Sequence, residues 1–231
     1  MTDCSGLVTA LRRSPTITDR HQSTDHHRSD LLDVVRAAER VFHAVDDCPT
    51  DAHEPAGRVF ETLLGGDLEP APARARGEAL PACAHLDDAV ARARERGGAT
   101  AGLADAVATI AEQLTWMRRE EPERPTPGFA DGHANAILAL ASGPEWNALM
   151  GISLMAPNVR YPDHEHPPEE VYLVLSPGEW RNERHAWFEP GVGHVVHNPP
   201  GIVHAMRSGQ LPLFAVWLHL DRRGSAPQFA S

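Results

Sequence analysis

The chain has 231 residues, of which 32 are acidic and 21 basic, and its formal net charge at pH 7 is −11. Every basic residue is an arginine, so the sequence excludes a Schiff-base lysine and the lysine of a phosphate-binding loop. The acidic balance disfavours binding to nucleic acid or to an anionic membrane surface, and we therefore expect a small-molecule partner.

The composition is typical of a globular protein, with 42% hydrophobic and 23% charged residues. The three cysteines are too scattered for a disulfide framework or a thiolate metal cluster. No segment approaches the roughly 20 apolar residues of a membrane span, and the N-terminus lacks a secretory signal. We expect a soluble, cytoplasmic protein.

The first half of the chain is predicted to be helical. Residues 1–29 lack hydrophobic periodicity and are expected to form a flexible N-terminal tail. Over residues 30–120, apolar side chains recur at steps of three and four, as they do in amphipathic helices. The first helix should begin near Asp30, and the later helices should include residues 59–64, 86–96 and 103–117.

The pattern changes at residues 121–128, where Pro122, Pro125 and Pro127 remove backbone donors and stop helix formation. Beyond them, short apolar runs alternate with glycine and proline, which is typical of strands joined by tight turns. A sandwich or barrel is therefore expected over residues 129–222. The apolar runs are 136–141, 148–155, 171–175, 194–197 and 213–220.

Two segments of this β part concentrate polar residues. They are Tyr161-Pro-Asp-His164-Glu-His166-Pro-Pro-Glu-Glu170-Val-Tyr172 and Gly193-His-Val-Val-His-Asn-Pro199-Pro-Gly201-Ile-Val-His204. Because strand side chains alternate between faces, His164 and His166 should project together, and Glu170 should project together with Tyr172.

The candidate metal ligands are His164, His166, Glu170 and His204. Three imidazoles and a carboxylate inside a barrel would each cost on the order of several kcal/mol in lost hydration. One divalent transition metal ion would offset this cost by accepting their lone pairs. These donor types do not choose among Zn, Fe, Mn, Co and Ni, so the identity of the ion stays open.

This double motif resembles that of the cupin superfamily. His164, His166 and Glu170 match its His-x-His-(three)-Glu motif, and the second segment matches its Gly-(five)-Pro-x-Gly-(two)-His motif, which ends at His204. The resemblance implies a mainly β fold with an α-helical N-terminal part. That fold would be a single cupin barrel (a double-stranded β-helix, or jelly roll) preceded by several helices.

Three positions depart from the superfamily pattern. Asn158 stands where the first motif usually opens with glycine, Gly178 comes one residue late, and Ser208 replaces the closing asparagine. None of them is a candidate ligand, so they concern the geometry of the loops.

Residues 129–220 are similar, more narrowly, to the cupin-type dimethylsulfoniopropionate (DMSP) lyases. Those enzymes carry a tyrosine two positions after the glutamate ligand, here Tyr172, and another shortly before the His-x-His, here Tyr161. The resemblance implies metal-dependent β-elimination of zwitterionic DMSP to acrylate and dimethyl sulfide. Tyr172 would be the base, and Tyr161 would position the substrate or serve as the alternative base.

A sulfonium group has no hydrogen to donate, so its site should offer aromatic faces, each contributing about 0.5–2 kcal/mol by cation–π attraction. For each tryptophan, core packing is the alternative role. His133, His185 and His219 have no partner that the sequence identifies. The aromatic candidates are Trp187, Trp180, Trp217 and Tyr161.

Two other functions compete with the lyase. A cupin dioxygenase or isomerase would use the same metal site on another small carboxylate, and oxygen consumption would reveal the dioxygenase. A non-catalytic cupin that binds a small ligand would keep its function after Tyr172→Phe. A homodimer is compatible with any of these, because cupins frequently associate through exposed sheet edges.

Overall fold

A computed structural model describes residues 17–70, 80–119 and 126–222 of the chain. Much of the predicted tail (residues 1–16) and of the proline-rich boundary (121–125) lies outside the described residues. The helices are α1 (Ile17–His43), α2 (His53–Gly65), α3 (Leu86–Glu95), α4 (Gly98–Ile110) and α5 (Phe129–Gly132), with 3-10 turns at Thr50–Ala52, Pro81–His85 and Ala111–Gln113.

Two helix boundaries differ from the sequence-based expectation. Helix α1 begins at Ile17 rather than near Asp30, so it includes residues that we assigned to the tail. The helix expected over 103–117 ends at Ile110, and Trp116–Met117 forms a strand, β2, paired with β3. Sheet pairing has overridden the helical spacing of Leu114 and Met117.

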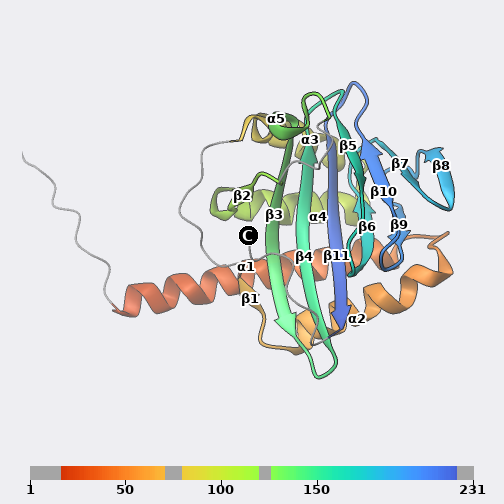
Figure 1. Cartoon of the computed structure of the whole chain (residues 1–231). Coiled ribbons are helices and arrows are strands. Elements are labelled where there is room, and N and C mark those ends of the chain that lie inside the picture. Colours follow the sequence, from red (N-terminus) through yellow and green to blue (C-terminus); the bar gives the residue numbers. More distant parts are fainter. Residues whose placement is uncertain (1–16, 71–79, 120–125, 223–231) are drawn as a thin grey trace, which may run out of the picture.

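Within the described residues, the strands form two antiparallel sheets (Figure 1). One sheet has seven strands in the order β1-β3-β4-β11-β6-β9, with β2 also paired to β3. The other has four strands in the order β5-β10-β7-β8. The strands are β1 (Glu69–Pro70), β2 (Trp116–Met117), β3 (His133–Ser142), β4 (Trp146–Met155), β5 (Arg160–His164), β6 (Glu169–Val174), β7 (Glu179–Asn182), β8 (His185–Phe188), β9 (Val195–Asn198), β10 (His204–Arg207) and β11 (Leu213–Arg222).

Strand β11 shows how the sheet separates two cores. Phe214, Val216 and Leu218 pack with the helices, whereas Ala215 and Trp217 pack with the four-stranded sheet. A strand can be hydrophobic on both faces when each face is covered, which explains the continuous apolar run over 213–220. The inner face of the seven-stranded sheet and the facing four-stranded sheet thus enclose the barrel interior.

The helices cover the outer face of the seven-stranded sheet, where α1 and α4 lie against each other behind the strands (Figure 1). Leu31, Leu63 and Val107 of three different helices share one buried cluster with Ile152 of β4. A buried imidazole also links the two parts, because His197 of β9 lies 3.1 Å from the carboxylate of Asp51. The helical part and the barrel are therefore packed together.

The fold class expected from the sequence is confirmed: an α-helical N-terminal part precedes a cupin-type barrel of two antiparallel sheets. The five apolar runs correspond to β3, β4, β6, β9 and β11. The strands of the four-stranded sheet are short and carry Arg160, Arg181 and Arg207, which surround the Trp187 ring, so this part of the sequence shows no apolar run. Among the described residues, no helix has both the length and the hydrophobicity to cross a membrane.

Candidate metal centre and active site

The four candidate ligands meet inside the barrel. His164 ends β5 and pairs with His204 of β10, His166 lies in the turn after β5, and Glu170 lies on β6. His166, Glu170 and His204 are buried, and His164 is half-buried. The ligand atoms of the three histidines lie within 4.8 Å of one another.

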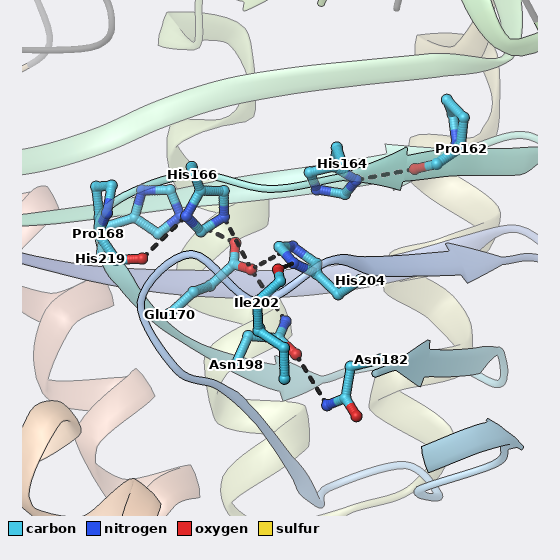
Figure 2. A network of polar contacts seen from close by, with 10 residues as sticks. All are labelled: Pro162, His164, His166, Pro168, Glu170, Asn182, Asn198, Ile202, His204 and His219. Atoms are coloured by element: carbon cyan, nitrogen blue, oxygen red, sulfur yellow. Dashed lines mark hydrogen bonds and ion pairs between the residues drawn. The ribbon is translucent and has the colours of Figure 1, made fainter. Parts of the chain in front are cut away.

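Backbone carbonyls fix the orientation of all three imidazoles. The Nδ1 atoms of His164, His166 and His204 lie 2.9 Å from the carbonyl oxygens of Pro162, Pro168 and Ile202, respectively (Figure 2). A carbonyl oxygen can only accept, so each Nδ1 carries the hydrogen and each Nε2 of the neutral ring carries a lone pair. Metal-binding histidines are held by the same kind of contact.

The Nε2 atoms converge on the carboxylate of Glu170. The Oε2 atom of Glu170 lies 3.1 Å from Nε2 of His204 and 3.3 Å from Nε2 of His166. Both nitrogens are buried and have no hydrogen bond of acceptable geometry among the described residues. Lone pairs that face one another at this distance repel unless a proton or a cation lies between them. The donor set therefore fits a divalent transition metal ion.

The electrostatics of the cluster favour a neutral His164 and an ionised Glu170, but they favour the protonated form of His166. Burial lowers the pKa of His164 well below its usual value, and the nearby His204 lowers it further. Burial opposes ionisation of Glu170, but the charge of His166 and the hydrogen bond from His219 outweigh it and hold its pKa well below the usual range. Burial also lowers the pKa of His166, but the charge of Glu170 prevails, so the net shift is upward.

His219 is part of the cluster, although the sequence did not identify a partner for it. It lies on β11 directly opposite Glu170 of β6, and its Nε2 is 2.9 Å from Oε1 of the carboxylate. His166, Glu170 and His219 form a second group whose ligand atoms lie within 4.8 Å of one another. Strand alternation could have indicated His219, because Ala215, Trp217 and His219 project to the same face of β11.

Asn198 contacts Glu170 from the other side. Its Nδ2 donates to Oε2 of Glu170 over 3.2 Å, and its Oδ1 accepts from Nδ2 of Asn182 over 3.3 Å. Asn182 and Asn198 are both buried. The carboxylate is thus contacted by protein donors on both oxygens.

Both tyrosines are buried in the barrel interior. Tyr172 lies two positions after Glu170 on the same face of β6, and burial, together with the charges of Glu170 and Tyr161, raises its pKa well above the usual value. The centroid of the Tyr161 ring lies 4.1 Å from that of the His164 ring. Burial raises the pKa of Tyr161 as well. Either phenol needs a nearby cation to act as a base at neutral pH.

Arg119 supplies such a cation close to Tyr161. The sequence patterns did not identify this arginine as a site residue. Its guanidinium carbon lies 5.6 Å from the centroid of the Tyr161 ring. Its positive charge opposes the upward pKa shifts of both Tyr161 and Tyr172. No ion pair joins Arg119 to an acidic residue in the part of the chain that the structure describes.

The three tryptophans are not equivalent. Trp180 and Trp217 are buried inside the barrel. The ring centroids of Trp180 and Tyr172 are 6.4 Å apart, and those of Trp217 and His219 are 4.6 Å apart. Trp187 instead lies among guanidinium groups outside the barrel, the nearest being that of Arg207 at 4.4 Å. The structure therefore does not bring Trp187 to the candidate metal ligands.

Two of the three departures from the cupin pattern, Asn158 and Ser208, have a local structural explanation. Asn158 has a φ of 59°, in the left-handed region that glycine favours and that asparagine tolerates better than most residues. Ser208 accepts a hydrogen bond from the backbone N–H of Val159 and donates to the carbonyl of Ala156. The turn before β5 is therefore held by a serine in place of the usual asparagine.

Comparison with known proteins identifies the family. The sequence profile of the dimethylsulfoniopropionate lyase family matches residues 58–215. The protein DddL of Cereibacter sphaeroides is 29% identical over 157 residues, and the dimethylsulfoniopropionate lyase DddQ of Ruegeria pomeroyi is 29% identical over 132 residues. These matches cover 65% and 56% of this chain, and 64% and 66% of the relatives, so the chain spans just under two thirds of their length.

The crystal structure of the DMSP lyase DddQ from Ruegeria pomeroyi superposes on this chain with a TM-score of 0.59 and 25% identity. The match covers 87% of this chain and 95% of the DddQ chain. The family profile alone spans more than half of the chain, and it includes the candidate ligands His164, His166, Glu170 and His204, both tyrosines and helices α3 and α4. The chain belongs to the dimethylsulfoniopropionate lyase family.

Proposed function

We propose that the protein cleaves DMSP to acrylate and dimethyl sulfide in the barrel interior. The observation that carries the proposal is the position of Tyr172, which lies on the inward face of β6 two positions after Glu170, whose carboxylate lies against His166 and His204. A buried phenol next to a candidate metal centre suits removal of a proton from a weakly acidic carbon.

The elimination requires no oxidant or further reactant. Tyr172, as a phenolate, accepts the proton from the carbon next to the substrate carboxylate, and the electron pair of that C–H bond forms the new double bond. The C–S bond breaks, and its electron pair leaves on sulfur as neutral dimethyl sulfide. When held by His164, His166, Glu170 and His204, a divalent metal ion supplies a Lewis acid that neutralises the carboxylate and favours the phenolate.

The side chains around the centre fit the two charged ends of the substrate. Arg119 has no acidic partner among the described residues and can pair with the carboxylate. The rings of Trp180, Trp217 and Tyr161 line the interior and can contact the sulfonium group by cation–π attraction. Trp187 lies outside the barrel and has no part in this proposal.

The test is to prepare the protein with Zn, Fe, Mn, Co or Ni in turn, add DMSP, and measure dimethyl sulfide in the headspace and acrylate in solution. The proposal expects equal amounts of both products with at least one metal. Absence of both products with every metal would overturn it. An oxygen electrode run in parallel would detect dioxygenase activity, which is the main competing reaction.

A further inference from the structure

We propose that His219 and Asn198 are positioning residues that hold the carboxylate of Glu170 from two sides. They would present its Oε2 atom, and not Oε1, to the histidines. This inference rests on the proposed metal centre but not on the identity of the substrate. Figure 2 shows Glu170 between these two side chains, with His166 and His204 beside it.

The sheet register places the three residues side by side. Strand β6 lies between β11 and β9, and Glu170 is directly opposite His219 on one neighbour and Asn198 on the other. Residues paired in this way project to the same face of the sheet. A slip of one residue in either pairing would turn its partner to the helical face, so the register itself specifies both contacts.

The hydrogen-bonding chemistry of the contact between His219 and Glu170 shows which group donates. An ionised carboxylate only accepts hydrogen bonds, so Nε2 of His219, 2.9 Å from Oε1, carries a hydrogen and donates it. In that tautomer Nε2 is not available to a metal ion, although His219 lies close enough to be a ligand. The Oε2 atom of Glu170 then faces His166 and His204 at 3.3 and 3.1 Å.

Asn198 is oriented by contacts of its own. Asn182 donates its Nδ2 hydrogen to Oδ1 of Asn198, which directs Nδ2 of Asn198 toward Glu170. The Oδ1 atom of Asn182 accepts from the backbone N–H groups of Arg184 and His185 at 3.1 and 3.0 Å. A chain of hydrogen bonds therefore runs from the turn between β7 and β8 to the carboxylate.

The test measures metal binding without substrate, so it is independent of any lyase activity. The affinity of the purified protein for Co²⁺ is determined by competition with a chelator, and the visible spectrum of bound Co²⁺ reports the coordination. Loss of a partner that orients a ligand weakens metal binding by about 10–100-fold. We expect this loss for His219→Leu and Asn198→Ala, and a smaller loss for Asn182→Ala.

The variant His219→Gln separates positioning from ligation, because a glutamine amide can still donate to Oε1. We expect it to restore the affinity to within a few-fold of the parent and to leave the Co²⁺ spectrum unchanged. His53→Leu on the exposed surface of α2 and Asn147→Ala at the far end of β4 are the matched controls. Circular dichroism and thermal unfolding establish that each variant is folded.

Three results would overturn the inference. In the first, folded His219→Leu binds Co²⁺ as the parent does, with the same spectrum. In the second, His219→Gln loses as much affinity as His219→Leu and changes the spectrum, as expected if His219 were itself a ligand. In the third, the parent protein binds no metal. A parent that binds metal but releases no dimethyl sulfide would contradict only the proposed function.

Discussion

Gly151 on β4 lies directly opposite Trp217 on β11, and the indole occupies the space that a side chain at position 151 would need. A Cβ atom added to Gly151 would lie 2.5 Å from Cε2 of Trp217 and 2.6 Å from the carbonyl oxygen of Ala136. This glycine therefore permits the indole to lie inside the barrel, against the ring of His219.

Gly151→Ala should destabilise the protein by about 1–3 kcal/mol, because neither the indole nor the β3 backbone can move without disturbing a packed interior. The free energy of unfolding is measured by urea denaturation. Gly209→Ala is the matched control, since a Cβ atom there meets no atom within 4 Å. Equal stability of the two variants would show that the interior adapts to the added methyl group.

Tyr172→Phe should lower the turnover of DMSP by about 10²–10⁴-fold, the usual contribution of a general base. The variant should retain its metal, because the phenol is not among the candidate ligands. Turnover is followed as dimethyl sulfide release, and metal content by elemental analysis. If Tyr161→Phe abolished turnover and Tyr172→Phe did not, the role of base would pass to Tyr161.

Arg119→Leu should raise the KM for DMSP by about 10–100-fold, as expected for loss of a hydrogen-bonded pair of charges. The kcat should also fall, since the guanidinium favours the phenolate form of both tyrosines. The neighbouring Arg118 is the control, because it pairs with Asp131 over 2.7 Å. An unchanged KM in Arg119→Leu would exclude this arginine from substrate binding.

Addition of a divalent metal ion to metal-free protein should raise its thermal unfolding temperature. A ligand at a free concentration about 100 times its Kd stabilises the folded state by about 2.7 kcal/mol, provided that it does not bind the unfolded chain. His204→Ala removes a ligand and should abolish most of this gain. A gain of the same size in His204→Ala would place the bound metal elsewhere.

His133 should make the protein sensitive to mild acid. Burial, with a further contribution from the charge of Arg119, lowers its pKa from 6.5 to about 3. Below pH 6.5, the pKa of this histidine in the unfolded chain, the unfolded chain binds a proton that the folded protein does not. The free energy of unfolding therefore falls as the pH falls. From about pH 7 to about pH 5 this single group should cost about 2 kcal/mol.

The variant His133→Gln tests this expectation, since its amide can still pair with Ser153, the present partner of Nε2 at 3.0 Å. Urea denaturation at the two pH values should show a smaller loss of stability in His133→Gln than in the parent. His53→Gln, at an exposed site, should behave as the parent does. An identical pH dependence in all three proteins would assign the acid sensitivity to other groups.

Local patterns in the sequence predicted several strands of this protein and the residues that share a face on them. Strand alternation predicted that His164 projects with His166 and that Tyr172 shares a face with Glu170, and the resemblance of the double motif to the cupin pattern added His204. The apolar runs indicated five strands of the seven-stranded sheet, because a strand buried on both faces carries a long hydrophobic run. Apart from the addition of His204, these features depend on neighbours along the chain, so each segment is enough to predict them.

The tertiary structure decided what lies between distant segments. His219 and Asn198 flank Glu170 only because β11 and β9 pair with β6 in one register, and that register is set by packing on both faces of the sheet. Likewise, Arg119 reaches Tyr161 and Trp187 is excluded from the interior through the docking of elements that no motif specifies. Such contacts depend on the packing of the whole core, which no single segment of the sequence reveals.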